Sequence, residues 1–100
     1  MLKFAVVAHE NDNVATAVKD LQKGETVLLD IGGKAQSVTL QEKVAFGHKF
    51  AVAFIPKEGK VIKYGEIIGH AIEEIPIGHY AHVHNIVSDR GRGDLEVRGQ

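Results

Sequence analysis

Histidine is unevenly distributed in this sequence, with four of its six copies close together near the C-terminal end: His70, His79, His82 and His84. His82 and His84 are two residues apart, so on a strand both imidazoles would lie on the same face. Two imidazole nitrogens at this spacing can bind one metal ion. The sequence therefore offers His82 and His84 as candidate metal ligands. The alternative is a strand that turns its polar face to solvent.

Two further segments place lysine beside glycine, Gly47-His48-Lys49 and Lys63-Tyr64-Gly65-Glu66. Glycine lets a ligand approach the backbone closely, and lysine is a compact charged donor for a carboxylate. These segments indicate a site for a small acid that is built from His48, Lys49, Lys63 and Tyr64. The alternative is that each lysine only extends its charged end from a half-buried strand into water.

Several other classes of site and partner are disfavoured by the composition. The sequence has no cysteine, so it offers no thiolate nucleophile and no cysteine-ligated metal. With 12 basic and 13 acidic residues among 100, the net charge of -1 argues against a nucleic-acid or membrane-surface partner. The first ten residues are too short and too soon acidic for a secretory signal, and no apolar run approaches a membrane span. We therefore expect a cytoplasmic protein.

A cupin-type metal barrel is a further alternative, because such domains also carry His-x-His on a strand. Cupins continue to a glutamate a few residues later, where this sequence has Ser88-Asp89. No histidine follows His84 that could supply the second cupin motif. The cupin interpretation is therefore disfavoured.

The elements that must position these residues are mostly short strands, because valine and isoleucine are abundant and eleven glycines are spread at turn-like intervals. One helix is predicted near residues 13–22, where Val14, Ala15, Val18 and Leu21 form an amphipathic stripe. The segment Asn11-Asp12-Asn13 would cap its start and Gly24 its end. The predicted strands are Leu2–Ala8, Thr26–Ile31, Gln36–Leu40, His48–Ile55 and His79–Val87.

The chain is expected to form one domain over residues 1–87, followed by a flexible tail at 88–100. Gly32-Gly33 is suited to the tight turn of a hairpin. Ile55-Pro56 is echoed by Ile75-Pro76, which indicates two similar connections between strands.

Taken in order, five motifs of this sequence resemble a known family: His9-Glu10-x-Asp12-Asn13-Val14-Ala15, Lys23-Gly24-Glu25, Gly47-His48-Lys49-Phe50-Ala51, Lys63-Tyr64-Gly65-Glu66-Ile67-Ile68-Gly69 and His82-Val83-His84-Asn85. The series is similar to the N-terminal SAF-type module of the altronate and galactarate dehydratases, and to the small subunit of sulfolactate sulfo-lyase. The resemblance implies a β-clip fold, which agrees with short antiparallel strands and one helix.

The resemblance also implies the chemistry of a lyase that removes the proton α to a carboxylate and eliminates the β substituent. His82 and His84 would then be catalytic, with a divalent metal, possibly iron, as Lewis acid. His48, Lys49, Lys63 and Tyr64 would bind the sugar-acid substrate. The fused enzymes continue into a large catalytic domain, so we expect a small subunit that works with a separate large dehydratase subunit.

Three expectations concern assembly. The segment Ser88–Gln100, with Arg90 and Arg92, is predicted to dock on the large subunit. Exposed strand edges make a homodimer plausible. The alternative to an enzyme subunit is a non-catalytic module that binds a small acid or assembles a complex.

Overall fold

The computed structural model describes residues 4–88, and within them the chain is built of strands joined by turns, with no helix. The strands are β1 (Ala5–Val6), β2 (Val14–Ala17), β3 (Thr26–Ile31), β4 (Lys34–Thr39), β5 (Lys49–Ala51), β6 (Lys60–Lys63), β7 (Glu66–Ala71), β8 (Tyr80–Ala81) and β9 (Ile86–Ser88). The expected mostly-β class is confirmed.

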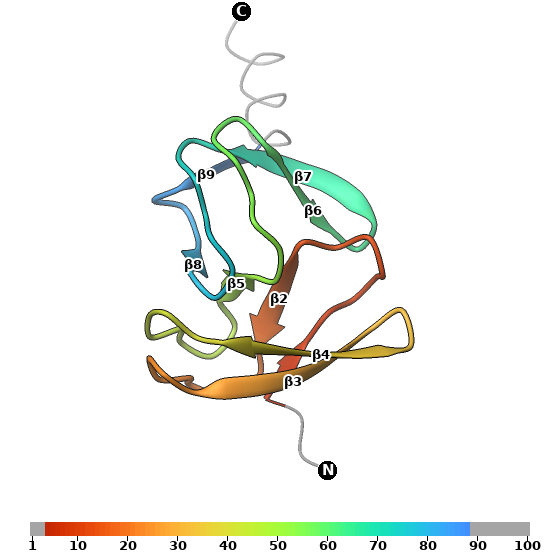
Figure 1. The fold of residues 1–100 in the computed structure, drawn as a ribbon. Coiled ribbons are helices and arrows are strands. Elements are labelled where there is room, and N and C mark those ends of the chain that lie inside the picture. The colour runs from red at the N-terminus through yellow and green to blue at the C-terminus, as the bar shows by residue number, and fades with distance from the viewer. Residues whose placement is uncertain (1–3, 89–100) are drawn as a thin grey trace, which may run out of the picture.

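The strands form three antiparallel sheets, which Figure 1 shows stacked along the molecule. A central sheet has the order β1-β2-β5-β8, and the β3–β4 hairpin covers one side of it. The third sheet, with the order β6-β7-β9, covers the other side. The predicted turn at Gly32-Gly33 does join β3 to β4, and both glycines have positive φ.

The central sheet separates two hydrophobic cores because neighbouring side chains on a strand face opposite ways. Phe50 packs in the core beneath the β3–β4 hairpin, whereas Ala51 packs in the core toward β6, β7 and β9. Lys49 is two residues from Ala51 and so lies on the same side of β5. This alternation directs Lys49 toward the third sheet.

Four segments of the chain share one local structure, and we call them corner segments: 17–26, 40–49, 51–60 and 71–80. Each contains a bend, a single bridge residue and a turn. The bridges pair the corner segments two by two, Leu21 with Val44 and Ile55 with Ile75. The predicted echo around Ile55 and Ile75 is therefore part of a fourfold repeat of structure.

The helix predicted near residues 13–22 is wrong, since residues 14–17 form β2. β2 is an inner strand with both faces covered, so Val14, Ala15 and Ala17 are all buried and imitate the stripe of a helix. The expected capping residue Asn13 has another role. Its side chain donates to the Lys60 carbonyl and accepts from the Ile62 amide, which ties β2 to β6.

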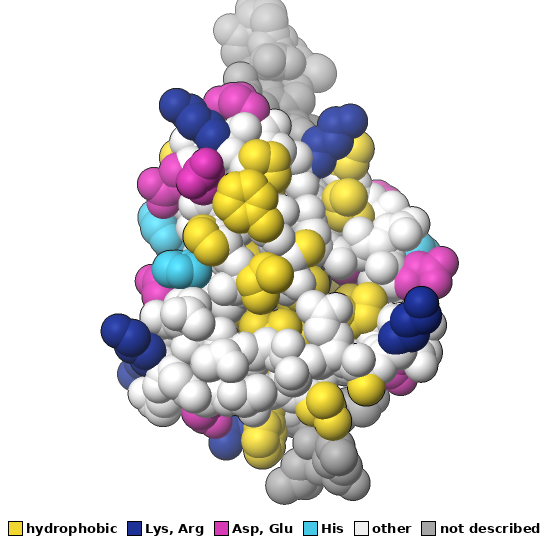
Figure 2. All heavy atoms as spheres, viewed as in Figure 1, with side chains coloured by type: hydrophobic (Ala, Val, Ile, Leu, Met, Phe, Trp, Pro, Cys, Tyr) yellow, Lys and Arg dark blue, Asp and Glu magenta, His cyan; other side chains and the backbone are white. Residues whose placement is uncertain are grey.

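Large hydrophobic side chains also remain on the surface, and Figure 2 shows hydrophobic atoms gathered along the middle of one face. The most exposed are Phe46 and Val83, at 66% and 79%. No helix among residues 4–88 is long and apolar enough to cross a membrane. Most of the predicted tail at 88–100, with Arg90 and Arg92, lies outside the described residues, and only Ser88 is seen, at the end of β9.

Candidate functional site

The pairing of β5 with β8 brings together residues that are more than thirty positions apart in the sequence. Lys49 is opposite Ala81, and Phe50 is opposite Tyr80. This register places the Gly-His-Lys segment beside the start of the His-x-His segment. His48 and His82 therefore meet at one edge of the central sheet.

At that edge the rings of His48, Tyr80 and His82 stack on one another. The centroids of His48 and His82 are 4.3 Å apart, and their ring planes differ by 14°. Tyr80 stacks on both histidines, and its hydroxyl forms a short hydrogen bond with His48 Nδ1. His84 lies on the outside, with its ring tilted against Tyr80 at 5.2 Å.

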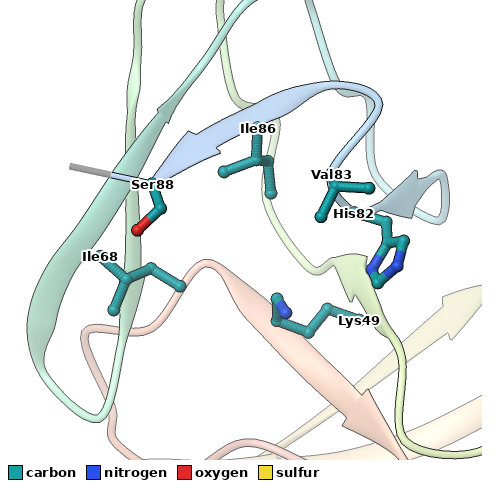
Figure 3. Close-up of a pocket in the computed structure, with 6 residues that line it drawn as sticks. All are labelled: Lys49, Ile68, His82, Val83, Ile86 and Ser88. Atoms are coloured by element: carbon teal, nitrogen blue, oxygen red, sulfur yellow. The ribbon is translucent and has the colours of Figure 1, made fainter. Parts of the chain in front are cut away.

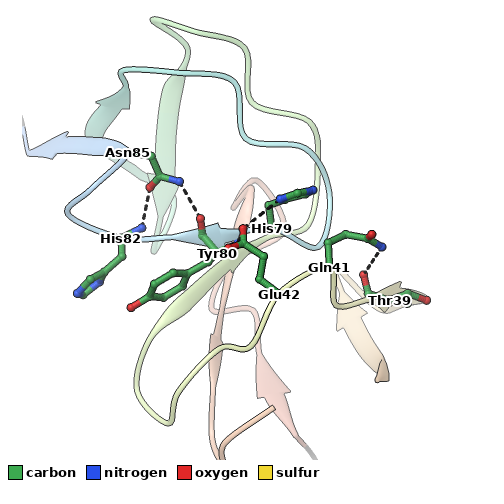
Figure 4. A network of polar contacts seen from close by, with 7 residues as sticks. All are labelled: Thr39, Gln41, Glu42, His79, Tyr80, His82 and Asn85. Carbon is green, nitrogen blue, oxygen red and sulfur yellow. Dashed lines mark hydrogen bonds and ion pairs between the residues drawn. The ribbon is translucent and has the colours of Figure 1, made fainter. Parts of the chain in front are cut away.

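The strand predicted over His79–Val87 is interrupted by a turn at residues 82–85, which separates β8 from β9. Buried Asn85 is the physical cause, because its side chain accepts from the His82 amide and donates to the Tyr80 carbonyl (Figure 4). The prediction that His82 and His84 share a strand face is therefore wrong. His82 is half-buried in the stack and His84 is exposed.

A cavity of about 350 Å³ opens beside this stack, between β5 and the third sheet (Figure 3). Lys49 and His82 supply polar groups to its wall, and Figure 3 shows the Lys49 side chain extending from β5 toward the open space. The rest of the lining is Ile68, Val83, Ile86 and Ser88. A small concave site with an apolar wall and a few polar groups is typical of ligand binding.

The charge of Lys49 is disfavoured by its surroundings. Partial burial lowers the pKa of the Lys49 ammonium below its usual value of 10.5, and the nearby positive charge of Lys63 lowers it further. The sequence prediction that Lys49 and Lys63 act as a pair is consistent with this electrostatic coupling. A bound anion would relieve the repulsion between the two ammonium groups.

Lys63 and Tyr64 lie at the end of the β6–β7 hairpin and do not line the cavity. Tyr64 is 64% exposed, and Lys63 Nζ lies 4.9 Å from the centre of its ring. Buried Asp12 fixes this turn, since its carboxylate accepts from the amides of His9, Tyr64 and Gly65. Asp12 therefore positions the hairpin that carries Lys63.

His82 has the electrostatics of a base. Desolvation lowers the pKa of His82 below 6.5, and the nearby positive charges of His48, Lys49 and His84 lower it further. A lowered pKa leaves the imidazole neutral at pH 7, so it can accept a proton.

The residues present do not by themselves fit a resident metal. Residues 4–88 contain no group of three or more histidine, cysteine, aspartate or glutamate side chains that could hold an ion. Protein sites for divalent transition metals usually have at least three such ligands. Metal binding by His82 and His84 stays a prediction.

Sequence reasoning missed most of the cavity wall. Ile68 and Ile86 are ordinary apolar strand residues, and no signal in the sequence distinguishes them from core residues. Tyr80 and Asn85 had a usable signal, because each belongs to the histidine-rich segment and bears a polar group. Their roles follow from the turn, which periodicity alone does not predict.

The comparisons with known proteins agree with this architecture. Residues 3–89 match the model of the altronate/galactarate dehydratase SAF domain. The chain belongs to this family. The resemblance expected from the motifs is thereby confirmed, and the match covers all the strands described above.

Individual relatives are enzymes or enzyme subunits. An altronate dehydratase of Escherichia coli (strain K12) is 48% identical over 77 residues, which are 77% of this chain and 15% of that protein. A galactarate dehydratase (L-threo-forming) of the same organism is 37% identical, over 77% of this chain and 14% of that protein. The (2R)-sulfolactate sulfo-lyase subunit alpha of Chromohalobacter salexigens is 26% identical, over 84% of this chain and 94% of that protein. The chain thus spans about a seventh of the length of the two dehydratases.

Proposed function

We propose that this chain is the SAF part of a sugar-acid dehydratase of the altronate or galactarate type, in which it binds the substrate carboxylate. The observation that carries the proposal is the cavity in which Lys49 and His82 meet. A cation and a neutral imidazole in one small cavity match the two requirements of α-proton removal, which are to hold the carboxylate and to accept the proton.

Each residue has a stated part in this proposal. Lys49 attracts the carboxylate, and the nearby charge of Lys63 adds to this attraction. The bound anion relieves the repulsion between the two cations. His82 accepts the α-proton. His48 keeps the His82 ring in place by stacking, and Tyr80 fixes His48 through its hydroxyl. Neither Tyr64 nor His84 lines the cavity. Their proposed parts are substrate binding by Tyr64 and proton transfer by His84, whose ring lies against Tyr80.

A large dehydratase subunit is the proposed partner, and the small separate chain named subunit alpha among the relatives supports that form. The apolar strip on the surface in Figure 2 supports a contact with another protein, since exposed patches of this kind mark interfaces. Metal binding is proposed only for the assembled enzyme, in which groups of the large subunit would add the ligands that residues 4–88 lack.

The test is isothermal titration of the purified chain with galactarate, altronate and sulfolactate, with and without ferrous iron. We expect binding that Lys49→Ala and His82→Ala abolish. Lys34→Ala is the matched control, because it removes an exposed cation from the β3–β4 hairpin, which covers the opposite side of the central sheet from the cavity. Equal binding by Lys49→Ala and Lys34→Ala would refute the carboxylate site.

The alternative, an assembly module without chemistry, is separated from the first proposal by a complex reconstituted with the large subunit. A catalytic base requires that His82→Ala lower kcat. An assembly role predicts that His82→Ala leaves kcat unchanged and that surface changes such as Phe46→Ser weaken the complex.

A further inference from the structure

We propose that the Lys49 amine is a nucleophile that condenses with the carbonyl group of a 2-oxo acid to form an imine. The inference rests on the proposed function for the class of ligand, because loss of water from a 2,3-dihydroxy acid yields an enol that becomes a 2-oxo acid. The nucleophile itself is inferred from the cavity and the groups around Lys49.

The position of Lys49 within the fold is the first argument. Register places it on the face of β5 that looks toward the third sheet, opposite Ala81. The side chain is half-buried and lines the cavity together with the apolar groups of Ile68 and Ile86. Figure 3 shows its nitrogen end at the open space among the other lining side chains.

The electrostatic setting of Lys49 is the second argument. Lysine is made nucleophilic by desolvation in an apolar pocket or by a neighbouring cation, and Lys49 has both. Burial and the charge of Lys63 each lower its pKa, so more of it is free amine than at an exposed lysine. Its two roles use its two protonation states, since the ammonium attracts a carboxylate and the amine attacks a carbonyl.

The atoms, protons and electrons of the condensation can be accounted for as follows from Lys49, the ketone, His82 and water. The Nζ lone pair of Lys49 forms a bond to the carbonyl carbon, and the C=O π electrons move to oxygen, which takes up a proton. The nitrogen of this carbinolamine loses one proton to the imidazole of His82, which lines the same cavity. His82 returns this proton to the carbinolamine hydroxyl, which leaves as water, and the resulting iminium gives its N–H proton to solvent, which replaces the solvent proton that the carbonyl oxygen had taken up. Amine and ketone thus give imine and one water. No oxidant or reductant is consumed.

The ligand class follows from the charges. A carboxylate next to the carbonyl carbon would lie near the second cation, Lys63, whose field already reaches Lys49. The cavity of about 350 Å³ holds a short 2-oxo acid with space to spare. The apolar wall of Ile68 and Ile86 can pack against the carbon chain of such an acid.

The test is reductive trapping on the full chain. Pyruvate and sodium cyanoborohydride are added at pH 7, and the reduced adduct, heavier by about 72 Da for an imine formed with loss of water, is located by peptide mapping. We expect at least about tenfold more adduct on Lys49 than on exposed Lys34, because binding raises the local concentration of the ketone. Lys49→Arg should lose this adduct, and Lys34→Arg should keep it.

Several results would overturn the inference: no adduct, equal adduct on Lys49 and Lys34, or adduct mainly on Lys63. The wild-type peptide map gives the answer even where Lys49→Arg folds poorly. Failure here is distinct from failure of the proposed function. Absent trapping with intact galactarate binding removes only the nucleophile, whereas trapping without galactarate binding removes only the sugar-acid site.

Discussion

The turn of the third corner segment should become more stable when Glu58 is replaced by glycine. In the other three corner segments the equivalent position holds Gly24, Gly47 or Gly78, all with φ between 84° and 91°. Glu58 has φ of 69°, in a region that costs a residue with a Cβ about 1–2 kcal/mol. Its amide still donates to Ala71, a bond that glycine retains.

The expected gain is smaller than this strain, because glycine loses about 0.5–1 kcal/mol more backbone entropy on folding. Glu58→Gly should therefore raise the free energy of unfolding by roughly 0.5–1 kcal/mol, which for a domain of this size raises Tm by about 2–8 °C. Urea denaturation and calorimetry measure both quantities. A variant with unchanged or lower Tm would refute the argument.

Replacing glycine by alanine in two other corner segments tests whether positive φ is the cause of the strain. An added Cβ at Gly47 meets no atom within 4 Å, so Gly47→Ala should lose only the conformational term, about 0.5–1 kcal/mol. The same Cβ at Gly78 would lie 2.2 Å from the Thr39 carbonyl oxygen, so Gly78→Ala should lose much more. Equal losses at the two positions would show that backbone conformation alone accounts for both and that the close approach of Thr39 adds nothing.

Three further predictions concern the site. Asp12→Asn should lower the free energy of unfolding by about 1–3 kcal/mol in urea titrations, since one of three backbone amides would face an NH₂ group. Tyr80→Phe should cost about 0.5–1.5 kcal/mol and shift the Nδ1 resonance of His48 in ¹⁵N NMR, while an unmoved resonance would exclude the hydrogen bond. Lys49→Met should raise the pKa of His82 toward 6.5 in an NMR titration by removing a positive charge, and a fall would contradict the stated cause. Because the folded-state pKa of His82 lies below the unfolded value, its contribution to stability is complete above about pH 6.5 and is lost as the pH falls below it.

Much of the fold could be predicted because its signals are local. Gly32-Gly33 specifies a hairpin turn, and alternating Val27 and Leu29 point into a core from β3. The failure at residues 13–22 has a physical reason. A strand buried on both faces shows no alternation, and what distinguishes β2 from a helix is the bond of Asn13 to β6, some fifty residues away.

The site was predictable in part for the same reason. The residue types at His48, Lys49 and His82 indicated chemistry, and the structure brings these three together. The sequence could not predict the direction in which each of these side chains faces. The two hydrogen bonds of the Asn85 side chain replace a strand by a turn. The side chains after His82 therefore do not follow the alternation that a continuous strand would give them.

The edge of a short sheet is a physically suitable place for this site. β8 has only two residues, so the backbone leaves the sheet directly after Ala81 and carries His82 over the cavity. A longer strand would keep the chain in the plane of the sheet. The alternation of side chains along the strand would then alone decide where His82 lies relative to Lys49. The buried Asn85 turn removes that restriction, and its cost is low because both of its polar ends are bonded. The cation and the base thereby come from two different strands, while stacking on His48 holds the base in one orientation.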